Sequence, residues 1–223
     1  MEEKAKIRYQ DKNILILNKK SGVVCTNEGR NNKETLEDWL IQKFGENNLP
    51  RQGIVHRLDK GTSGLMVVAK NVETRNKMLD MFKNREIKKT YLALIEGDLS
   101  KEGNIKVPIA RSKYTFGKFA VSEEGKMAET SFKLVKKYYY DNKTYSLIEI
   151  NLKTGRTHQI RVHFSYLRWP LVGDLTYGGT RFLGLSRPFL ESIKLEFKHP
   201  ETGANLSFEG ELASDLKELL SKL

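Results

Sequence analysis

The sequence predicts an α+β fold in which short strands outnumber helices. Short apolar runs in the first half are typical of buried strands. Two amphipathic stretches, each preceded by a polar residue that can cap a helix, are typical of helices. In the second half, polar and apolar residues alternate, which predicts hairpins.

The first half contains two expected strands and two expected helices. Residues 14–17 form a branched apolar run, and the polar segment 18–22 that follows has the composition of a surface turn. Residues 65–69 are apolar throughout, which is typical of a central strand covered on both faces. Thr35 is expected to cap a helix whose buried side carries Leu36, Trp39, Leu40 and Phe44. Asn71 is expected to cap a second helix, whose buried side carries Met78, Leu79 and Phe82.

A third strand is expected over residues 90–95, and it completes a strand, helix, strand unit. Period-two alternation marks four later strands, at Phe132 and Leu134, at Ile148, Ile150 and Leu152, at Ile193, Leu195 and Phe197, and at Leu206 and Phe208. Residues 199–203 form a turn between the last two strands. Ser214 opens a final helix with leucines along one face.

Composition and charge favour a nucleic-acid partner. Lys and Arg number 39 against 28 Asp and Glu, which gives a net charge of +11. A polyanion is the expected partner of such a surface, although many basic proteins bind no nucleic acid. The single cysteine, Cys25, cannot form an internal disulfide, and no apolar run suits a signal peptide or a membrane helix. These features predict a cytoplasmic protein.

Residues 53–64 place basic, acidic and hydroxyl side chains in a glycine-bounded loop before an expected strand. Asp59 lies close to Arg57 and Lys60, and nearby cations favour the ionised carboxylate, which suits a nucleophile or a base. The alternative is structural, because Asp59 could simply pair with Arg57 and cap the loop. Local sequence leaves both interpretations open.

A second cluster, residues 154–163, follows a strand and opens a helix. Its backbone N–H groups, with Arg156 and Arg161, could face an anion, or the arginines could be solvated. The histidines show no zinc-ligand spacing, so we expect no metal. Loops typical of nucleotide hydrolysis and dinucleotide redox chemistry are absent from the sequence.

Aromatic residues occur among basic ones in two places. One is Lys89-Thr90-Tyr91, and the other is residues 136–140, Lys-Lys-Tyr-Tyr-Tyr, where packing on an edge strand is the alternative to stacking on RNA bases. A noncatalytic RNA-binding protein is a second hypothesis, but the chain has no RNP-type motif or Gly-x-x-Gly clamp. A glycosidase would need a second carboxylate near Asp59, and none is obvious.

The segment 56–65, His-Arg-Leu-Asp-Lys-Gly-Thr-Ser-Gly-Leu, closely resembles the signature of RluA-type pseudouridine synthases. Residues 9–22, Lys89-Thr90-Tyr91, residues 154–163, and residues 170–174 with Tyr177-Gly178 are similar to further motifs of that family, in the same order. Two departures affect placement within the family. Lys20 stands where a proline is usual, and residues 187–192 replace a segment that usually carries Leu-His-Ala.

The resemblance implies a mixed, mainly antiparallel β-sheet flanked by helices, with an active-site cleft across the sheet. Composition shows no sharp domain boundary, so we expect one catalytic domain over residues 1–223 with two lobes, which could divide at residues 96–106 or near Gly125. Many members of the family carry an N-terminal RNA-binding domain, and we expect no separate one here. The implied partner is RNA, and we expect a monomer with no obligatory protein partner.

The implied activity is conversion of a uridine in ribosomal RNA or tRNA to pseudouridine, without a cofactor. Asp59 is the implied catalytic residue. Three residues would bind substrate: Arg57 would fill the space left by the flipped uridine, Tyr91 would stack on the uracil, and Arg161 would pair with Asp59.

Overall fold

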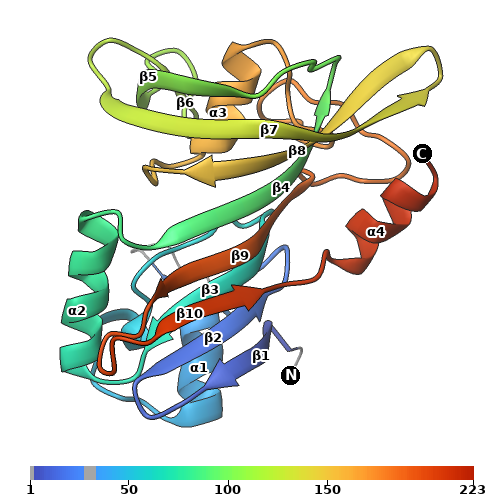
Figure 1. Ribbon diagram of the computed structural model, residues 1–223. Coiled ribbons are helices and arrows are strands. Elements are labelled where there is room, and N and C mark those ends of the chain that lie inside the picture. The colour runs from blue at the N-terminus through green and yellow to red at the C-terminus, as the bar shows by residue number, and fades with distance from the viewer. Residues whose placement is uncertain (1–2, 28–33) are drawn as a thin grey trace. The chain divides into compact units, whose positions relative to one another are not determined.

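The computed structural model describes residues 3–27 and 34–223. The chain forms two compact units. Unit 1 comprises Met1–Lys89 and Ser192–Glu211, and unit 2 comprises Thr90–Glu191 and Leu212–Leu223. Both stretches considered above as lobe divisions, residues 96–106 and Gly125, lie inside unit 2. The units are described separately below, with elements labelled as in Figure 1.

Unit 1 is built on five strands in the order β1-β2-β3-β9-β10. The pairs β1–β2, β2–β3 and β9–β10 are antiparallel. The elements of this unit are β1 (Ala5–Gln10), β2 (Ile14–Lys19), α1 (Leu36–Phe44), the 3₁₀ helix η1 (Pro50–Gly53), β3 (Ser63–Ala69), α2 (Val72–Lys83), β9 (Leu190–Lys198) and β10 (Asn205–Glu209).

The strand β3 is buried along its whole length, as its apolar sequence predicts. Leu65 and Val67 on one face belong to a core cluster with Met78 of α2. On the other face, the Met66 Sδ lies 3.8 Å from the Cys25 Sγ. The strand is thus covered on both faces, which fixes the direction of the loop that precedes it.

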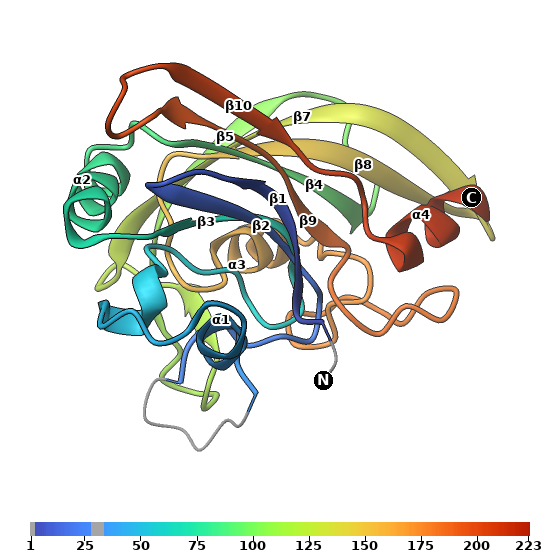
Figure 2. The same cartoon turned by 90° about the horizontal axis from the view of Figure 1, so that it is seen from below.

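Both predicted helix caps of unit 1 are confirmed. Thr35 accepts a hydrogen bond from the Asp38 backbone N–H, and the Asp38 carboxylate accepts from the Thr35 N–H, so the two residues form a capping box. The Asn71 side chain accepts from the Thr74 N–H at the start of α2. Figure 2 shows α1 and α2 beside the strands of this unit.

The segment 18–22 is not uniformly at the surface, which corrects one expectation. Lys19 is 1% exposed, whereas Lys20 and Gly22 are exposed. Burial is possible because the Lys19 ammonium donates to the carbonyls of Lys20 and Val23, each at 2.9 Å. The buried ammonium of Lys19 therefore holds the two ends of this turn together through hydrogen bonds.

Unit 2 contains five strands in the order β4-β8-β7-β5-β6. The pairs β4–β8, β7–β8, β5–β7 and β5–β6 are antiparallel. Its elements are β4 (Lys88–Glu96), β5 (Gly103–Arg111), β6 (Phe119–Val121), β7 (Lys126–Tyr140), β8 (Lys143–Leu152), α3 (Gln159–Tyr166) and α4 (Ser214–Ser221). Sequence periodicity predicted parts of β4, β7 and β8, but it missed β5 and β6.

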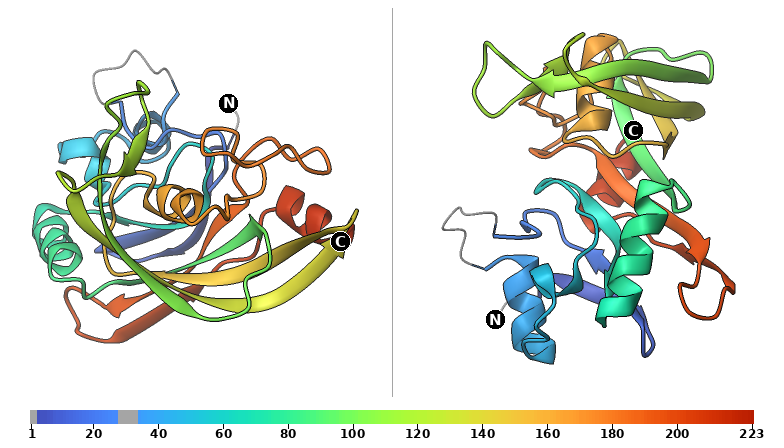
Figure 3. Two further views of the ribbon diagram at one scale, coloured as in Figure 1. Left: turned by 90° about the horizontal axis from the view of Figure 1, so that it is seen from above. Right: turned by 90° about the vertical axis from the view of Figure 1, so that its left-hand side faces the viewer.

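Two apolar clusters hold the helices of unit 2 in place. Val162 of α3 packs with Ile109 of β5 and Ala128 of β7. The helix α4 contributes Leu216 and Leu219 to a second cluster around Tyr145 of β8. Figures 1 and 3 show α4 beside the β7–β8 hairpin.

Mainly antiparallel strand pairing with a few packed helices confirms the predicted α+β fold class. No helix in the described ranges is long and apolar enough to span a membrane. The active-site cleft stays a prediction.

Candidate active site

The loop that carries Asp59 joins η1 to β3, and a neighbouring turn of unit 1 holds it. The Gly22 N–H donates to the Lys60 carbonyl at 2.8 Å, and the Ser21 hydroxyl donates to the Gly61 carbonyl at 3.0 Å. The Leu58 carbonyl accepts from the Cys25 thiol at 3.3 Å. The turn shaped by Lys19 thus fixes the backbone on either side of Asp59.

Asp59 itself closes a tight turn, because its carbonyl accepts from the Thr62 N–H at 3.1 Å. Its side chain is partly buried, whereas Arg57 is exposed. Leu58 between them is only 6% exposed and anchors the loop in the core. This alternation aims the polar side chains away from the apolar interior of the unit.

Gly64, the second residue of β3, allows β9 to approach closely. Its φ is +117°, and a Cβ at this position would lie 2.3 Å from the Ser192 carbonyl oxygen. No side chain fits in that space. The start of β3 can therefore lie directly against the backbone of β9 at Ser192.

His56 has a structural role in the described contacts. Its Nε2 accepts from the Val67 N–H at 2.9 Å, and its ring lies 4.8 Å from that of Phe82. Removal from water, together with the nearby charge of Lys89, lowers the pKa of His56 to about 3. A neutral imidazole that already accepts a hydrogen bond fastens the loop to β3.

In unit 2, residues 154–163 follow β8 and lead into α3, as predicted. The Thr154 hydroxyl donates to the Gln159 Oε1 at 2.7 Å and accepts from the Glu129 N–H at 2.8 Å. The Gln159 amide nitrogen donates to the Thr130 hydroxyl at 2.9 Å. These bonds attach the first turn of α3 to β7. His158 precedes this turn in the left-handed conformation, with φ 55°.

The two arginines of this segment lie in different surroundings. Arg156 is exposed, and its Nε donates to the Met127 carbonyl at 3.2 Å. Arg161 is buried and forms a two-pronged ion pair with Asp174, at 2.7 Å from Nε to Oδ2 and 2.8 Å from Nη2 to Oδ1. This pair uses the edge of the guanidinium group that carries Nε and Nη2.

Tyr177 completes the surroundings of Arg161. The guanidinium carbon lies 4.8 Å from the centre of the Tyr177 ring. The Tyr177 hydroxyl accepts from the Phe119 N–H at 3.0 Å and lies 2.8 Å from the His158 Nδ1. Asp174, Tyr177 and His158 thus fix the orientation of Arg161. Sequence reasoning had not given Asp174 a role, although it had noted the segment around it.

Tyr91 lies on β4, opposite Ile150 of β8, and is 6% exposed. It belongs to unit 2 together with Arg161, whereas Arg57 and Asp59 belong to unit 1. Joint action of these four residues stays a prediction.

Sequence reasoning missed one aromatic loop, residues 112–118, between β5 and β6. Tyr114 is 98% exposed and Phe116 is 104% exposed. The Ser112 hydroxyl accepts from the N–H groups of Tyr114 and Thr115, so the loop backbone is ordered from within. Basic residues flank the rings at Arg111, Lys113 and Lys118. That interleaving of cations and aromatics is the signal that could have identified this loop.

The chain belongs to the RNA pseudouridylate synthase family, because the sequence profile of the family described as "RNA pseudouridylate synthase" matches residues 13–166. The enzymes of this family isomerise uridine to pseudouridine in RNA. The resemblance in the loop around Asp59 is thereby confirmed at the level of the family.

Individual relatives agree with this membership. The chain is 36% identical to an uncharacterised RNA pseudouridine synthase of Bacillus subtilis, over 97% of this chain and 72% of the relative. It is 38% identical to ribosomal large subunit pseudouridine synthase D of Neisseria meningitidis, over 97% of this chain and 60% of the relative. The chain spans only part of the length of each.

A solved structure has a similar fold. Human RNA pseudouridylate synthase domain containing 1 matches with a TM-score of 0.76 and 28% identity, over 93% of this chain and 83% of that one.

Proposed function

We propose that this protein isomerises a uridine in structured RNA, and that ribosomal RNA is the first substrate to examine. Family membership supports the reaction, and the names of the relatives in Neisseria meningitidis and Pseudomonas aeruginosa, ribosomal large subunit pseudouridine synthase D, support the RNA. A tRNA substrate is the alternative. We further propose a cytoplasmic monomer that acts without a cofactor.

The observation that carries the proposal is the fixed loop around Asp59. Backbone contacts at Leu58, Lys60 and Gly61 hold the loop to neighbouring segments of unit 1. Preorganisation of this kind is what a catalytic carboxylate requires, because its position must not vary between turnovers.

The reaction breaks the N1–C1′ bond, turns the uracil and forms a C5–C1′ bond. The proton on C5 must leave and N1 must gain one, so the overall change is an isomerisation with no external reactant. We propose that Asp59 attacks the base or the sugar, or promotes departure of the base.

The remaining roles are proposed on the family resemblance. The target uridine would leave the RNA stack, Arg57 would occupy the vacated space, and Tyr91 would stack on the uracil. Arg161 would pair with Asp59. The exposed rings of Tyr114 and Phe116, with basic neighbours, support contact with unpaired bases.

The test is pseudouridine mapping by carbodiimide labelling and reverse transcription, on total RNA from cells with and without this protein. We expect one defined site to disappear, and an Asp59→Asn protein should not restore it. Purified protein incubated with unmodified transcripts, with and without a metal chelator, tests independence from metals. Restoration of the site by Asp59→Asn would instead favour a noncatalytic RNA-binding protein.

A further inference from the structure

Three strands of unit 2 meet at one end of its sheet, beside α3. The strand β5 ends at Arg111, β6 begins at Phe119 and β7 begins at Lys126. In the register of the sheet, Arg111 lies opposite Phe119, and Lys126 lies opposite Ile109. Figures 1 and 3 show α3 beside these strands. Arg111 and Lys126 are therefore diagonal neighbours on adjacent strands, about 7–8 Å apart.

Both cations lie on the face of the sheet that carries α3. Ala128, two residues after Lys126, packs with Val162 of α3. Ile109, two residues before Arg111, belongs to the same apolar cluster. Side chains two positions apart in a strand point to the same face. Arg111 and Lys126 are both exposed, so they add positive charge to this face just beyond its apolar contacts with α3.

The turn that leads into β7 is held against β5. The Ser122 N–H donates to the Pro108 carbonyl at 3.0 Å, and the Gly125 N–H donates to the Ser122 carbonyl at 2.9 Å. A Cβ on Gly125 would lie 2.5 Å from the carbonyl carbon of Ile109, so only glycine fits there. This close packing fixes the backbone position of Lys126.

Arg111 is held by an aromatic ring rather than by a carboxylate. Its guanidinium carbon lies 5.6 Å from the centre of the Phe119 ring. The neighbouring Glu124 pairs with Lys113. In residues 3–27 and 34–223, no carboxylate lies at ion-pairing distance from Arg111 or Lys126. Stacking occupies the flat face of a guanidinium group, so the N–H groups at its edge can still bind phosphate oxygens.

A series of ring contacts connects Arg111 to Arg161. The Phe119 ring lies 5.8 Å from that of His158, and the His158 ring lies 5.6 Å from that of Tyr177, both edge-on. The Tyr177 ring in turn lies 4.8 Å from the guanidinium carbon of Arg161. The packing thereby holds the exposed cation at a fixed position relative to Arg161.

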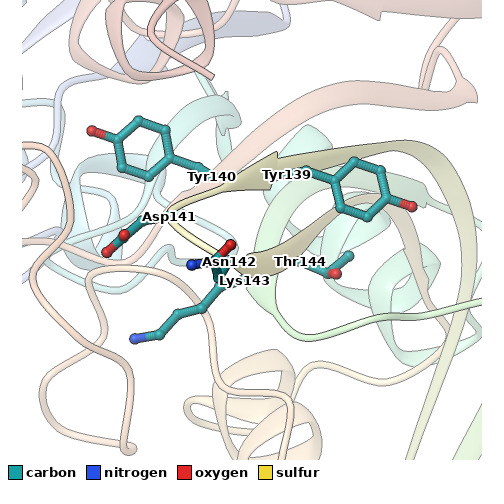
Figure 4. Close-up of a pocket in the computed structure, with 6 residues that line it drawn as sticks. All are labelled: Tyr139, Tyr140, Asp141, Asn142, Lys143 and Thr144. Carbon is teal, nitrogen blue, oxygen red and sulfur yellow. The ribbon is translucent and has the colours of Figure 1, made fainter.

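The opposite end of β7 is remote from this region. Residues 139–144 line a pocket there, with the rings of Tyr139 and Tyr140 on opposite sides of the hairpin (Figure 4). The strand β8 has 10 residues, so this turn lies about 30 Å from the segment before α3. Lys137 at that end pairs with Asp98. A contact with RNA close to the target uridine is therefore better placed at the start of β7.

We infer that Arg111 and Lys126, with Arg156 beside them, bind backbone phosphates of the RNA strand next to the target uridine. Arg156 is exposed, and its Nε donates to the carbonyl of Met127, the residue after Lys126. A row of cations follows a nucleic-acid backbone without reading its sequence. The loop 112–118, with its exposed rings, follows Arg111 directly. The inference rests on the proposed function for the identity of the RNA.

The test replaces each cation with glutamine and uses Lys133→Gln as the matched control. Lys133 also lies on β7, but on the opposite face, where it pairs with Glu149 at 3.0 Å. All three variants, Arg111→Gln, Lys126→Gln and Lys133→Gln, thus lose one positive charge. Binding of a fluorescein-labelled, 12-nucleotide single-stranded RNA of mixed sequence is measured by anisotropy at several salt concentrations.

On single strands, each phosphate contact contributes about 0.7 to the slope of log K against log[salt]. We expect Arg111→Gln and Lys126→Gln each to make this slope shallower by about 0.7 and to weaken binding about fivefold at about 0.1 M salt. Arg111→Lys keeps the charge and should keep the slope, and Lys133→Gln should change neither the slope nor the affinity. Thermal unfolding should be the same in Arg111→Gln and Lys126→Gln as in the wild type, because both side chains are exposed.

An equal change of slope in Lys133→Gln would overturn the inference, because loss of net charge would then explain the effect. Unchanged slopes in Arg111→Gln and Lys126→Gln would also overturn it. Single-turnover pseudouridine formation by the wild type on an unmodified ribosomal RNA transcript separates the two proposals. If product forms and the slopes are unchanged, the phosphate inference fails alone. If the slopes depend on the two cations but no product forms, the proposed function fails alone.

Discussion

At the scale of single residues, the ion pair between Arg161 and Asp174 organises unit 2 near α3. The side chains are 9% and 1% exposed, so both charges are removed from water. Such a pair is costly to break, because the remaining charge is left buried without its partner. Its role is to position Arg161, which the proposed mechanism requires.

Asp174→Ala is therefore expected to lower the free energy of unfolding by about 3–5 kcal/mol. Urea denaturation measures this. The control is Lys153→Ala, which removes a more exposed ion pair with Glu129 and should cost at most about 1 kcal/mol. Equal losses of unfolding free energy in the two variants would show that breaking the buried pair costs no more than breaking the exposed one.

His56 should make stability depend on pH. Its pKa is about 3 in the folded protein and about 6.5 in the unfolded chain. Between these values the unfolded state binds the additional proton, so stability falls as pH decreases from about 6.5 towards 3. Urea unfolding of His56→Gln between pH 4.5 and 6 should show a shallower slope than the wild type, by up to about 1.4 kcal/mol per pH unit. Identical slopes would contradict this account. His163 has a pKa of about 4 in the folded protein, so it also makes stability fall with decreasing pH. This contribution is expected to be the same in the wild type and in His56→Gln.

The candidate site could be predicted from sequence only where its parts are contiguous. Asp59 and Arg57 stand in one loop whose composition already suggested chemistry. Asp174 is 13 residues from Arg161 and meets it only through the tertiary fold, so no local pattern identified the pair. The burial of Lys19 could not be predicted from local sequence either, because a lysine in a turn is normally exposed. Its burial is explained by the carbonyls of Lys20 and Val23, which the fold places around its ammonium group.

At the scale of elements, helix caps are the most predictable features of this chain. Thr35 and Asn71 act through bonds to residues three positions away, and such local chemistry is readable from sequence. Ser214 differs, because it is the first residue of α4 and Ala213 occupies the cap position without a side-chain bond.

Thr35→Ala should consequently lower the free energy of unfolding by about 1 kcal/mol through loss of the capping box. Ser214→Ala is the matched control and should change stability little. Denaturant titration of the two variants, side by side, measures the difference. A cost for Ser214→Ala as large as that for Thr35→Ala would contradict the assignment of the caps.

The missed strands have physical reasons. The strand β5 contains Pro108, which normally argues against a strand, yet Pro108 pairs in register with Met127. The strand β6 has only three residues, all partly buried, too few to establish alternation. Tertiary pairing, rather than local preference, determines both.

At the scale of the whole molecule, the net charge of +11 is the feature that bears most on function. Binding to an RNA backbone releases counterions, so affinity should fall steeply as salt is added. Filter binding of ribosomal RNA at several salt concentrations gives the slope of log K against log[salt]. We expect a clearly negative slope. Affinity independent of salt would exclude extensive phosphate contact.

Asp59 is proposed to carry out the isomerisation. Single-turnover pseudouridine formation on an unmodified ribosomal RNA transcript tests it most directly, with wild type and Asp59→Asn at equal, saturating RNA occupancy. We expect no detectable product from Asp59→Asn, with RNA affinity and unfolding free energy close to those of the wild type. Substantial product from the variant would contradict the account, because the reaction would then proceed without the carboxylate.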